Sequence, residues 1–169
     1  LFLLGVDEVE VPEGAFVVYQ GTHGDRGALR ADVNLPGAAY TEKSALYVNT
    51  EGRVQMADRA AFPPGDARED WAILRALSAN LGQTLEFDSL AELRAKLFEA
   101  HPHLTGIDAI EPGDAADLEK LANAKAKMDS AGFANAVRDF YLTNPIARAS
   151  RTMAECSSLA QSRAAEAAE

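Results

Sequence analysis

The sequence has very few of the residues that carry redox chemistry, and it has no long apolar run. Its 169 residues include one cysteine, Cys156, and one tryptophan, Trp71. A single thiol cannot form an internal disulfide, and it cannot by itself hold an iron–sulfur cluster or a structural zinc ion. No apolar run approaches the roughly 20 residues that span a bilayer. The opening LFLLGV lacks the basic flank and the cleavage site of a signal peptide.

Basic residues are also in the minority. Lysine and arginine together number 16 against 26 aspartates and glutamates, which gives a formal net charge of −10. Such a chain repels phosphate backbones and anionic lipid surfaces, so it is expected to bind no nucleic acid and to insert into no membrane directly. What remains is an acidic chain with 47% hydrophobic residues, enough for one globular domain with or without an extension.

The first third of the chain has the pattern of strands. Residues 1–6 (LFLLGV) and 16–19 (FVVY) are compact apolar runs, typical of strands covered on both faces in a parallel α/β sheet. Residues 31–35 predict a third short strand, closed by Pro36 and Gly37. Because the first run starts without a lead-in, we expect the chain to begin inside a larger protein.

A glycine-rich segment, residues 20–30 (QGTHGDRGALR), follows the second strand. Its glycines predict a loop in backbone conformations that only glycine adopts easily. Such a loop can cradle a phosphate or pyrophosphate, here through Gly21, His23, Gly24, Asp25 and Arg26. The glycine spacing fits neither the Rossmann fingerprint nor the P-loop. The preferred interpretation is therefore a tight structural turn, with His23 in a structural role.

Residues 44–49 and 53–56 predict a hairpin around the turn 49–52, with Gly52 supplying a positive φ. Charged side chains surround it, namely Glu42, Lys43, Glu51 and Arg53. Two carboxylates can perform acid–base catalysis, but ion pairs that order the loop are the preferred interpretation.

Helical patterns begin after Pro63 and Pro64. Asp66 with Glu69 predicts a capping box that opens a helix ending at Gly82, with Trp71 and a leucine series as its core face. Ser89 with Glu92 predicts a second helix. It stops at residues 101–103, where His101 and His103 lack a third metal ligand at a familiar spacing.

Two further helices are predicted. Residues 115–128 carry only a thin apolar stripe, so that helix should lie on the surface. Asn144 and Pro145 predict a helix start, followed by Ile146, Ala149, Met153, Cys156 and Ala160 at offsets of 3, 4, 3 and 4. We interpret this narrow seam as a docking face, with Cys156 as a buried, inert thiol. The final residues 161–169 are expected to fray. These patterns identify no catalytic residue and no metal site.

A family resemblance adds to this interpretation. Residues 31–55 (ADVNLPGAAYTEKSALYVNTEGRVQ) resemble the C-terminal part of the molybdopterin-oxidoreductase-like superfamily, with its A-D-V-x-L-P strand, a glutamate and an N-T-E-G-R turn. The matching structural-motif residues are Asp32, Pro36, Glu42, Asn49, Glu51, Gly52 and Arg53. Three more segments, residues 19–28, 63–78 and 139–156, are similar to the large iron–sulfur subunit of NADH:quinone oxidoreductase (complex I). Residues 87–136 show only a general helical likeness.

The resemblance implies an α/β fold in three parts: strands and hairpin of the molybdopterin-oxidoreductase-like domain (1–62), a helical region (63–136), and a docking helix with its tail (137–169). It implies a structural, non-catalytic part of a proton-translocating oxidoreductase that passes electrons from NADH to quinone. The 2Fe-2S and 4Fe-4S clusters would lie elsewhere in the parent subunit. The partners would be the rest of that subunit and other peripheral-arm subunits. The location would be the cytoplasmic side of the bacterial inner membrane or the matrix side of the mitochondrial one.

Two alternatives remain open. In the first, the chain is the cofactor-contacting portion of a true molybdopterin enzyme such as a formate dehydrogenase, with residues 20–30 against the pterin pyrophosphate. In the second, it is a free-standing acidic adaptor that binds a partner through the seam at residues 146–160.

Overall fold

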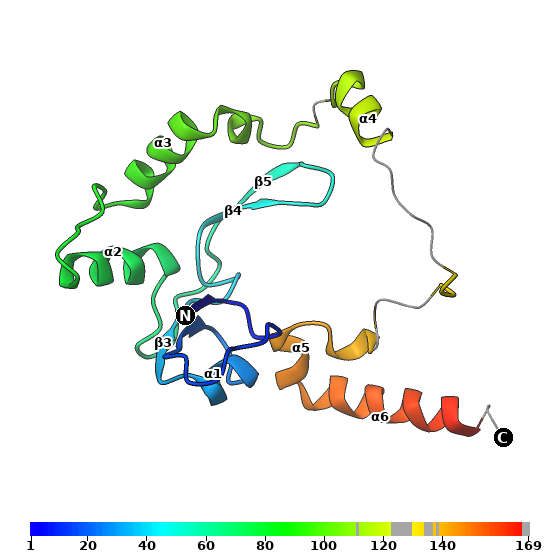
Figure 1. The fold of residues 1–169 in the computed structure, drawn as a ribbon. Helices are drawn as coiled ribbons and strands as arrows, with labels where there is room; N and C mark the ends of the chain where they lie inside the picture. Colours follow the sequence, from blue (N-terminus) through cyan, green and yellow to red (C-terminus); the bar gives the residue numbers. More distant parts are fainter. Residues whose placement is uncertain (111, 123–129, 134–136, 138, 167–169) are drawn as a thin grey trace.

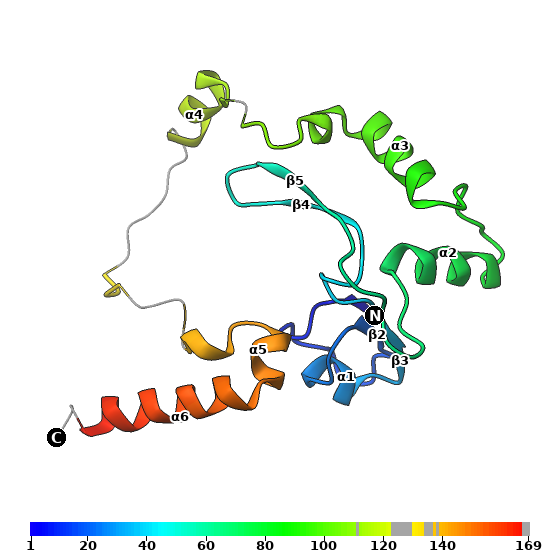
Figure 2. The same ribbon diagram turned by 180° about the vertical axis from the view of Figure 1, so that it is seen from behind.

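The fold was obtained as a computed structural model, which describes residues 1–110, 112–122, 130–133, 137 and 139–166. A small parallel sheet lies near the N-terminus, and a hairpin and two helices extend from it (Figure 1). The last two helices return to the sheet and then lead away from it (Figure 2). This α/β arrangement, with a helical second half, confirms the predicted fold class.

The parallel sheet consists of β1 (Phe2–Leu4), β2 (Val18–Gly21) and β3 (Val33–Pro36), in the order β1-β2-β3. Both neighbouring pairs are parallel, and Leu3 lies opposite Tyr19 in the register. The short helix α1 (Arg26–Arg30) connects β2 to β3. All three predicted strands are therefore present, with β2 starting two residues later than its apolar run.

The core is small and lies on one face of this sheet. Leu3, Val17 and Tyr19 are at most 4% exposed, and residues of the loops and of α1 pack against them. The neighbouring positions Phe2, Leu4 and Phe16 are 38%, 48% and 63% exposed. The opposite face is covered only in part, because Gln20 on that face is fully buried while Phe2 and Leu4 are exposed, so the expectation that both faces are covered holds only in part.

The predicted hairpin is confirmed. Strands β4 (Ala45–Val48) and β5 (Val54–Ala57) pair in antiparallel register. Gly52 takes the positive φ of 84° that the turn needs. The Asn49 Oδ1 atom accepts hydrogen bonds from the amides of Glu51 and Arg53 at 3.0 and 2.9 Å, which closes the turn.

Helix α2 (Asp70–Asn80) has its N-cap at Glu69, three residues later than the predicted cap at Asp66. The Arg68 amide donates to the Pro36 carbonyl at 3.1 Å, and the Ala38 amide donates to the Arg68 carbonyl at 2.8 Å. Residue 68 is thus extended beside the end of β3 and cannot join a helix, so Asp66 is not the cap. The predicted end is confirmed, since Gly82 has a φ of 75° directly after the last turn.

Helix α3 (Leu90–Ala100) has the predicted cap, because Ser89 Oγ accepts from the Glu92 amide at 3.2 Å. A 3-10 turn, η1 (Pro102–Thr105), follows it. Helix α4 (Ala115–Ala122) has no buried residue, as its thin stripe predicts. The remainder of that predicted helix, residues 123–128, lies outside the described residues.

The predicted tail helix is two helices. After η2 (Phe140–Leu142) come α5 (Pro145–Ala149) and α6 (Arg151–Glu166), separated by Ser150 with φ −85° and ψ 120°. The predicted start is confirmed, since Asn144 Oδ1 accepts from the Ala147 amide at 2.9 Å. Residues 161–166 are helical, where fraying was expected, and residues 167–169 of that prediction lie outside the described residues. Of the helices described, none combines the length and the apolarity that a bilayer crossing requires.

Candidate functional site

The glycine-rich segment 20–30 is the candidate ligand-binding loop predicted from the sequence. Its second half is not a loop, because Asp25 caps the helix α1 and accepts the Arg26 amide at 2.8 Å. None of Gly21, Gly24 and Gly27 has a positive φ. The prediction of glycine-only backbone conformations is therefore wrong at these positions.

Two of these glycines serve the core instead. A Cβ atom at Gly27 would lie 2.4 Å from Cε2 of Tyr19, and one at Gly21 would lie 2.3 Å from its hydroxyl oxygen. Tyr19 is 3% exposed, so its ring cannot swing away. The glycines are therefore explained by the close approach of the backbone to both ends of a buried tyrosine ring.

A shallow hollow of about 360 Å³ lies along this segment. Gly21, His23 and Gly24 line it, together with residues of α1 and β3. His23 Nδ1 is 2.7 Å from Thr22 Oγ1, so the imidazole has a local partner. Asp25 and Arg26 do not line the hollow. The structure thus brings together only three of the five candidate ligand residues.

The Asp25 carboxylate turns the other way, into a cluster around Arg148 of α5. We call this cluster, Arg148 with Asp7, Glu8 and Asp25, the arginine clamp. Arg148 pairs with Asp25, and its guanidinium lies 2.7 Å from Asp7 Oδ2 and 2.7 Å from Glu8 Oε1. It also donates to the Leu142 carbonyl at 3.2 Å.

The clamp is shielded from water at its centre. The side chains of Arg148, Asp7 and Asp25 are 14%, 5% and 15% exposed. The hydrogen bond from Arg148 is the main cause that lowers the pKa of Asp25, and the same contact raises the pKa of Arg148. Burial, followed by the nearby charges of Asp7 and Asp25, raises the pKa of Tyr19. Asp25 and Arg148 therefore keep their charges at neutral pH, and the Tyr19 hydroxyl keeps its proton.

A second polar cluster lies at the carboxyl ends of β1 and β2, and the sequence patterns did not reveal it. Gln20 is fully buried and donates to Asp70 Oδ1 at 2.9 Å, while Lys43 pairs with the other carboxylate oxygen of Asp70. A hollow of about 180 Å³ adjoins these three side chains. A glutamine directly after an apolar strand was the one available signal, but its partner is 50 residues away.

The motif residues near the hairpin act mainly through backbone contacts. Asp32 Oδ2 accepts the Val17 amide at 2.7 Å, and Glu42 Oε2 accepts the Ala39 amide at 2.9 Å. Pro36 is paired with Gly21 in the sheet. The expected ion pairs among Glu42, Lys43, Glu51 and Arg53 are not seen in the described part of the chain, because Lys43 pairs with Asp70 on α2.

The docking seam is not one continuous stripe. The bend at Ser150 leaves Ile146 and Ala149 on α5, while Met153 and Cys156 lie on α6. Cys156 is half-buried rather than buried. A sequence pattern with helical offsets cannot detect such a bend, because the offsets are the same on either side of it.

No group of three or more His, Cys, Asp and Glu residues in the described ranges has the geometry to hold a metal ion. The His101 and His103 rings lie edge to face, with centroids 5.9 Å apart, on an exposed turn.

Comparison with known proteins shows which families this chain matches. Residues 1–80 match the molybdopterin oxidoreductase family, and residues 109–156 match a family defined by the C-terminal region of an NADH-ubiquinone oxidoreductase subunit. The mitochondrial 78 kDa subunit of NADH-ubiquinone oxidoreductase from Neurospora crassa is 49% identical over 164 residues, which cover 93% of this chain and 22% of the relative.

Two further relatives agree. The 75 kDa subunit from Reclinomonas americana is 47% identical over 94% of this chain, and the mitochondrial 78 kDa subunit from Candida albicans is 48% identical over 92%. The chain spans less than a quarter of the length of these relatives, 22% to 23%. By these matches it belongs to the family of the 75 and 78 kDa subunits of NADH-ubiquinone oxidoreductase, within the molybdopterin-oxidoreductase-like superfamily.

Proposed function

We propose that the chain is a structural, non-redox part of the iron–sulfur subunit of a proton-translocating NADH:quinone oxidoreductase. The whole enzyme passes electrons from NADH through iron–sulfur clusters to quinone. In this proposal the chain shapes the subunit and makes contacts, and the 2Fe-2S and 4Fe-4S clusters are held by other residues of the parent. Its single cysteine does not fit a cluster that needs several thiolates.

The arginine clamp is the observation that carries the structural role. Arg148 joins a segment near residue 145 to two loops of the N-terminal sheet, across sequence separations of 123, 140 and 141 residues. It also occupies Asp25, one of the candidate ligand residues. Removing Asp25 from the ligand set favours a loop that supports the fold over one that holds a pyrophosphate.

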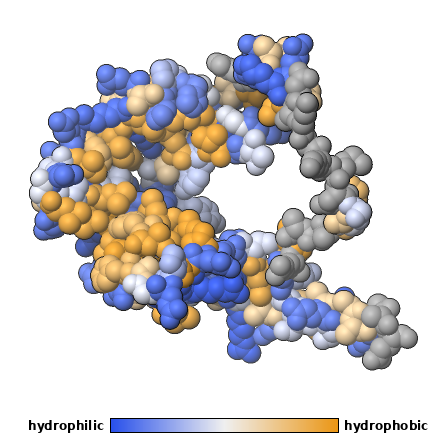
Figure 3. Space-filling model, viewed as in Figure 1, coloured by the Kyte–Doolittle hydropathy of each residue, from blue (hydrophilic) through white to orange (hydrophobic). Residues whose placement is uncertain are grey.

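The partners in this proposal are the rest of the parent subunit and neighbouring peripheral-arm subunits. The exposed apolar face of the sheet supports this, because a parallel sheet is usually covered on both faces. Figure 3 shows apolar residues gathered over this part of the molecule. The three sequence regions 1–62, 63–136 and 137–169 would then be a domain edge, a helical region and a docking tail. Ile146, Ala149, Met153 and Cys156 remain the candidate docking residues, now on two helices.

The location follows from the same proposal. The chain would lie on the cytoplasmic side of the bacterial inner membrane, or on the matrix side of the mitochondrial inner membrane, within the peripheral arm.

Metal analysis of the purified parent complex tests the proposal against its main alternative. The scaffold role predicts iron without stoichiometric molybdenum or tungsten. Either metal at one atom per complex would instead support a true molybdopterin enzyme with residues 20–30 at its cofactor.

Replacement of His23 in the assembled complex tests whether the same loop contributes to the rate of NADH oxidation. We expect His23→Ala to leave NADH oxidation nearly unchanged, since the imidazole contacts Thr22 within its own loop. A fall in kcat of about 100-fold with normal assembly is the size expected for loss of an acid–base group, and it would contradict the structural role.

A further inference from the structure

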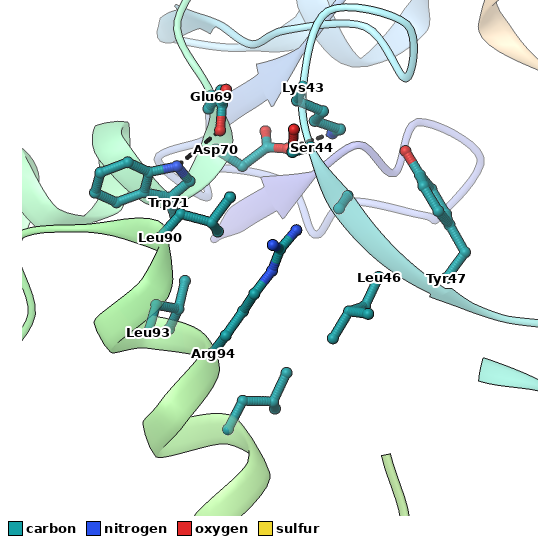
Figure 4. A pocket seen from close by; sticks show the side chains of 12 residues that line it. Lys43, Ser44, Leu46, Tyr47, Glu69, Asp70, Trp71, Leu90, Leu93 and Arg94 are labelled. Atoms are coloured by element: carbon teal, nitrogen blue, oxygen red, sulfur yellow. Dashed lines mark hydrogen bonds and ion pairs between the residues drawn. The ribbon is translucent and has the colours of Figure 1, made fainter. Parts of the chain in front are cut away.

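An open groove of about 330 Å³ lies between β4 and the helices α2 and α3. Its walls are mainly half-buried apolar side chains, which Figure 4 shows converging from three elements. They are Leu46 of β4, Trp71 of α2, and Leu90, Leu93 and Leu97 of α3. Trp71 was expected to belong to the core face of its helix, but here it lines a space that the described residues leave open.

The carboxylates at one end of the groove already have partners. Asp70 pairs with Lys43, and Glu69 accepts the Trp71 Nε1 hydrogen at 2.8 Å and pairs with Arg59 at 3.4 Å. Both carboxylates are therefore already paired with groups at the rim of the groove.

Arg94 is the exception among the charged side chains that line the groove. It extends from α3 into the space between the hairpin and α2 (Figure 4). Its Nη2 atom is shielded from solvent and has no hydrogen-bond partner among the described residues. A shielded guanidinium nitrogen without an acceptor is unfavourable, and a carboxylate is the acceptor that best satisfies it. The described residues thus offer this nitrogen of Arg94 no acceptor.

The backbone of β4 supplies a second, independent feature. The Asn49 amide donates to the Arg53 carbonyl at 3.1 Å, so in the alternating antiparallel pattern Leu46 and Val48 direct their backbone groups away from β5. No hydrogen bond from the described residues reaches these groups. Residues 43–47 all line the groove, which therefore follows the edge of β4 rather than one face of the hairpin. A free strand edge of this kind pairs readily with an extended peptide.

We propose that this groove binds an extended segment of a partner polypeptide, which places one aspartate or glutamate carboxylate on Arg94 and its apolar side chains among the leucines. The partner backbone adds to the free edge of β4. The peptide-binding test rests on the groove alone, whereas the identity of the partner rests on the assembly proposed above.

Peptide binding to the full chain tests the proposal, and Trp71, the only tryptophan, reports it by fluorescence. The probe is the capped peptide Val-Leu-Glu-Leu-Val, and its control is Val-Leu-Gln-Leu-Val. We expect saturable binding of the glutamate peptide, weakened about tenfold by the Gln control and about tenfold by Arg94→Gln, since a charge-assisted hydrogen bond is lost in both cases. In the double combination the two losses should not add, because both remove the same contact.

Lys96→Gln is the matched control, because it removes a cation from the exposed side of the same helix. It should change the affinity by less than about twofold, as expected for an exposed pair. Equal binding of the two peptides, an equal loss in the Lys96 variant, or no saturable response up to about 1 mM peptide, the weak end of specific affinity, overturns the proposal. Thermal unfolding of Arg94→Gln should match the unaltered chain, which separates lost binding from lost folding.

Photo-crosslinking in the intact parent complex identifies the occupant. A photoreactive residue at Leu93 should crosslink to one short acidic and apolar segment of a different polypeptide. Reversing the charge at that acidic residue together with Arg94→Glu should restore the yield that either change alone reduces. Crosslinks to a second copy, to the same polypeptide, or to scattered sites would overturn the assignment.

Discussion

At the scale of single residues, Tyr19 and Arg148 explain most of the glycine-rich segment. Tyr19 is buried between Gly21 and Gly27, and Arg148 engages Asp25 at the start of α1. A segment that is typical of ligand loops is therefore built around a tyrosine ring on one side and an ion cluster on the other.

Gly27→Ala should destabilise the chain because its new methyl group would lie 2.4 Å from the Tyr19 ring and 3.1 Å from Asp7 Cβ. Overpacking of this kind costs about 1–3 kcal/mol. Gly24→Ala is the matched control, since no atom lies within 4 Å of its added Cβ. Urea unfolding should show a large loss only for Gly27→Ala, and equal losses would contradict the packing explanation.

Arg148→Ala should lower the free energy of unfolding by about 3 kcal/mol, because it leaves two largely buried carboxylates without their cation. Arg151→Ala, which removes an exposed pair with Glu155, should cost less than about 0.5 kcal/mol. Chemical denaturation at neutral pH measures both. If the two variants were equally stable, the clamp would not be an anchor.

The effect of Arg148→Ala should also depend on pH. The pKa of Asp25 is lower in the folded chain than in the unfolded one, where a free aspartate titrates near about 4. The stabilisation is therefore complete above that pH and is lost as the pH falls through the lowered value. The difference between the two proteins should be constant from about pH 6 to 8 and should shrink below about pH 4. If the difference in free energy of unfolding between the two proteins grew as the pH fell, it would contradict a lowered pKa of Asp25.

At the scale of elements, helix α5 matters more than its length indicates. It has five residues and carries Arg148 to the sheet. Its predicted start at Asn144 and Pro145 is confirmed, because capping depends on side chains next to each other in sequence. Its end at Ser150 was missed. The Arg148 contacts lie 123 to 141 residues away, and no local pattern reports contacts of that kind.

Asn144→Ala should destabilise α5 and, through it, the clamp. The lost bond is the one from the Ala147 amide to Asn144 Oδ1 at 2.9 Å, and loss of such a cap costs about 1 kcal/mol. Ser162→Ala on the exposed side of α6 is the control and should stay within about 0.5 kcal/mol. Thermal unfolding followed by circular dichroism compares the two. A neutral Asn144 variant would mean that tertiary contacts alone hold this helix.

At the scale of the whole molecule, the chain has a small core and much exposed apolar surface. The described residues cover one face of the sheet and only part of the other, and the chain matches under a quarter of its relatives' length. A surface of this kind is typical of a contact face.

Phe16→Asp tests whether the exposed sheet face is such a contact. Phe16 is 63% exposed, so the change should leave the unfolding temperature of the isolated chain nearly unaltered. In the full-length subunit it should reduce incorporation into the complex severalfold, because assembly would bury an unpaired charge. Leu118→Asp on α4, where the side chain is 65% exposed, is the control. Complex yield on native gels decides the matter, and an undiminished yield for Phe16→Asp would count against this face.

The sequence by itself determined mainly the local structural elements and the protein family. The strands, the hairpin with Gly52, the caps at Ser89 and Asn144, and the stop at Gly82 depend on residues that are near one another in the chain. The family was recognisable because fixed residues recur in order, as in residues 31–55. These features needed no knowledge of distant contacts.

Only the tertiary structure decided the rest. It moved the N-cap of α2 from Asp66 to Glu69, because Arg68 pairs with the end of β3. It assigned Gly21 and Gly27 to the packing of Tyr19, and Asp25 to Arg148. It also left the Nη2 atom of Arg94, beside an open groove, without a hydrogen-bond partner among the described residues. Each outcome depends on groups that are far apart in sequence and close in space, so burial and charge pairing settle them where spacing along the chain cannot.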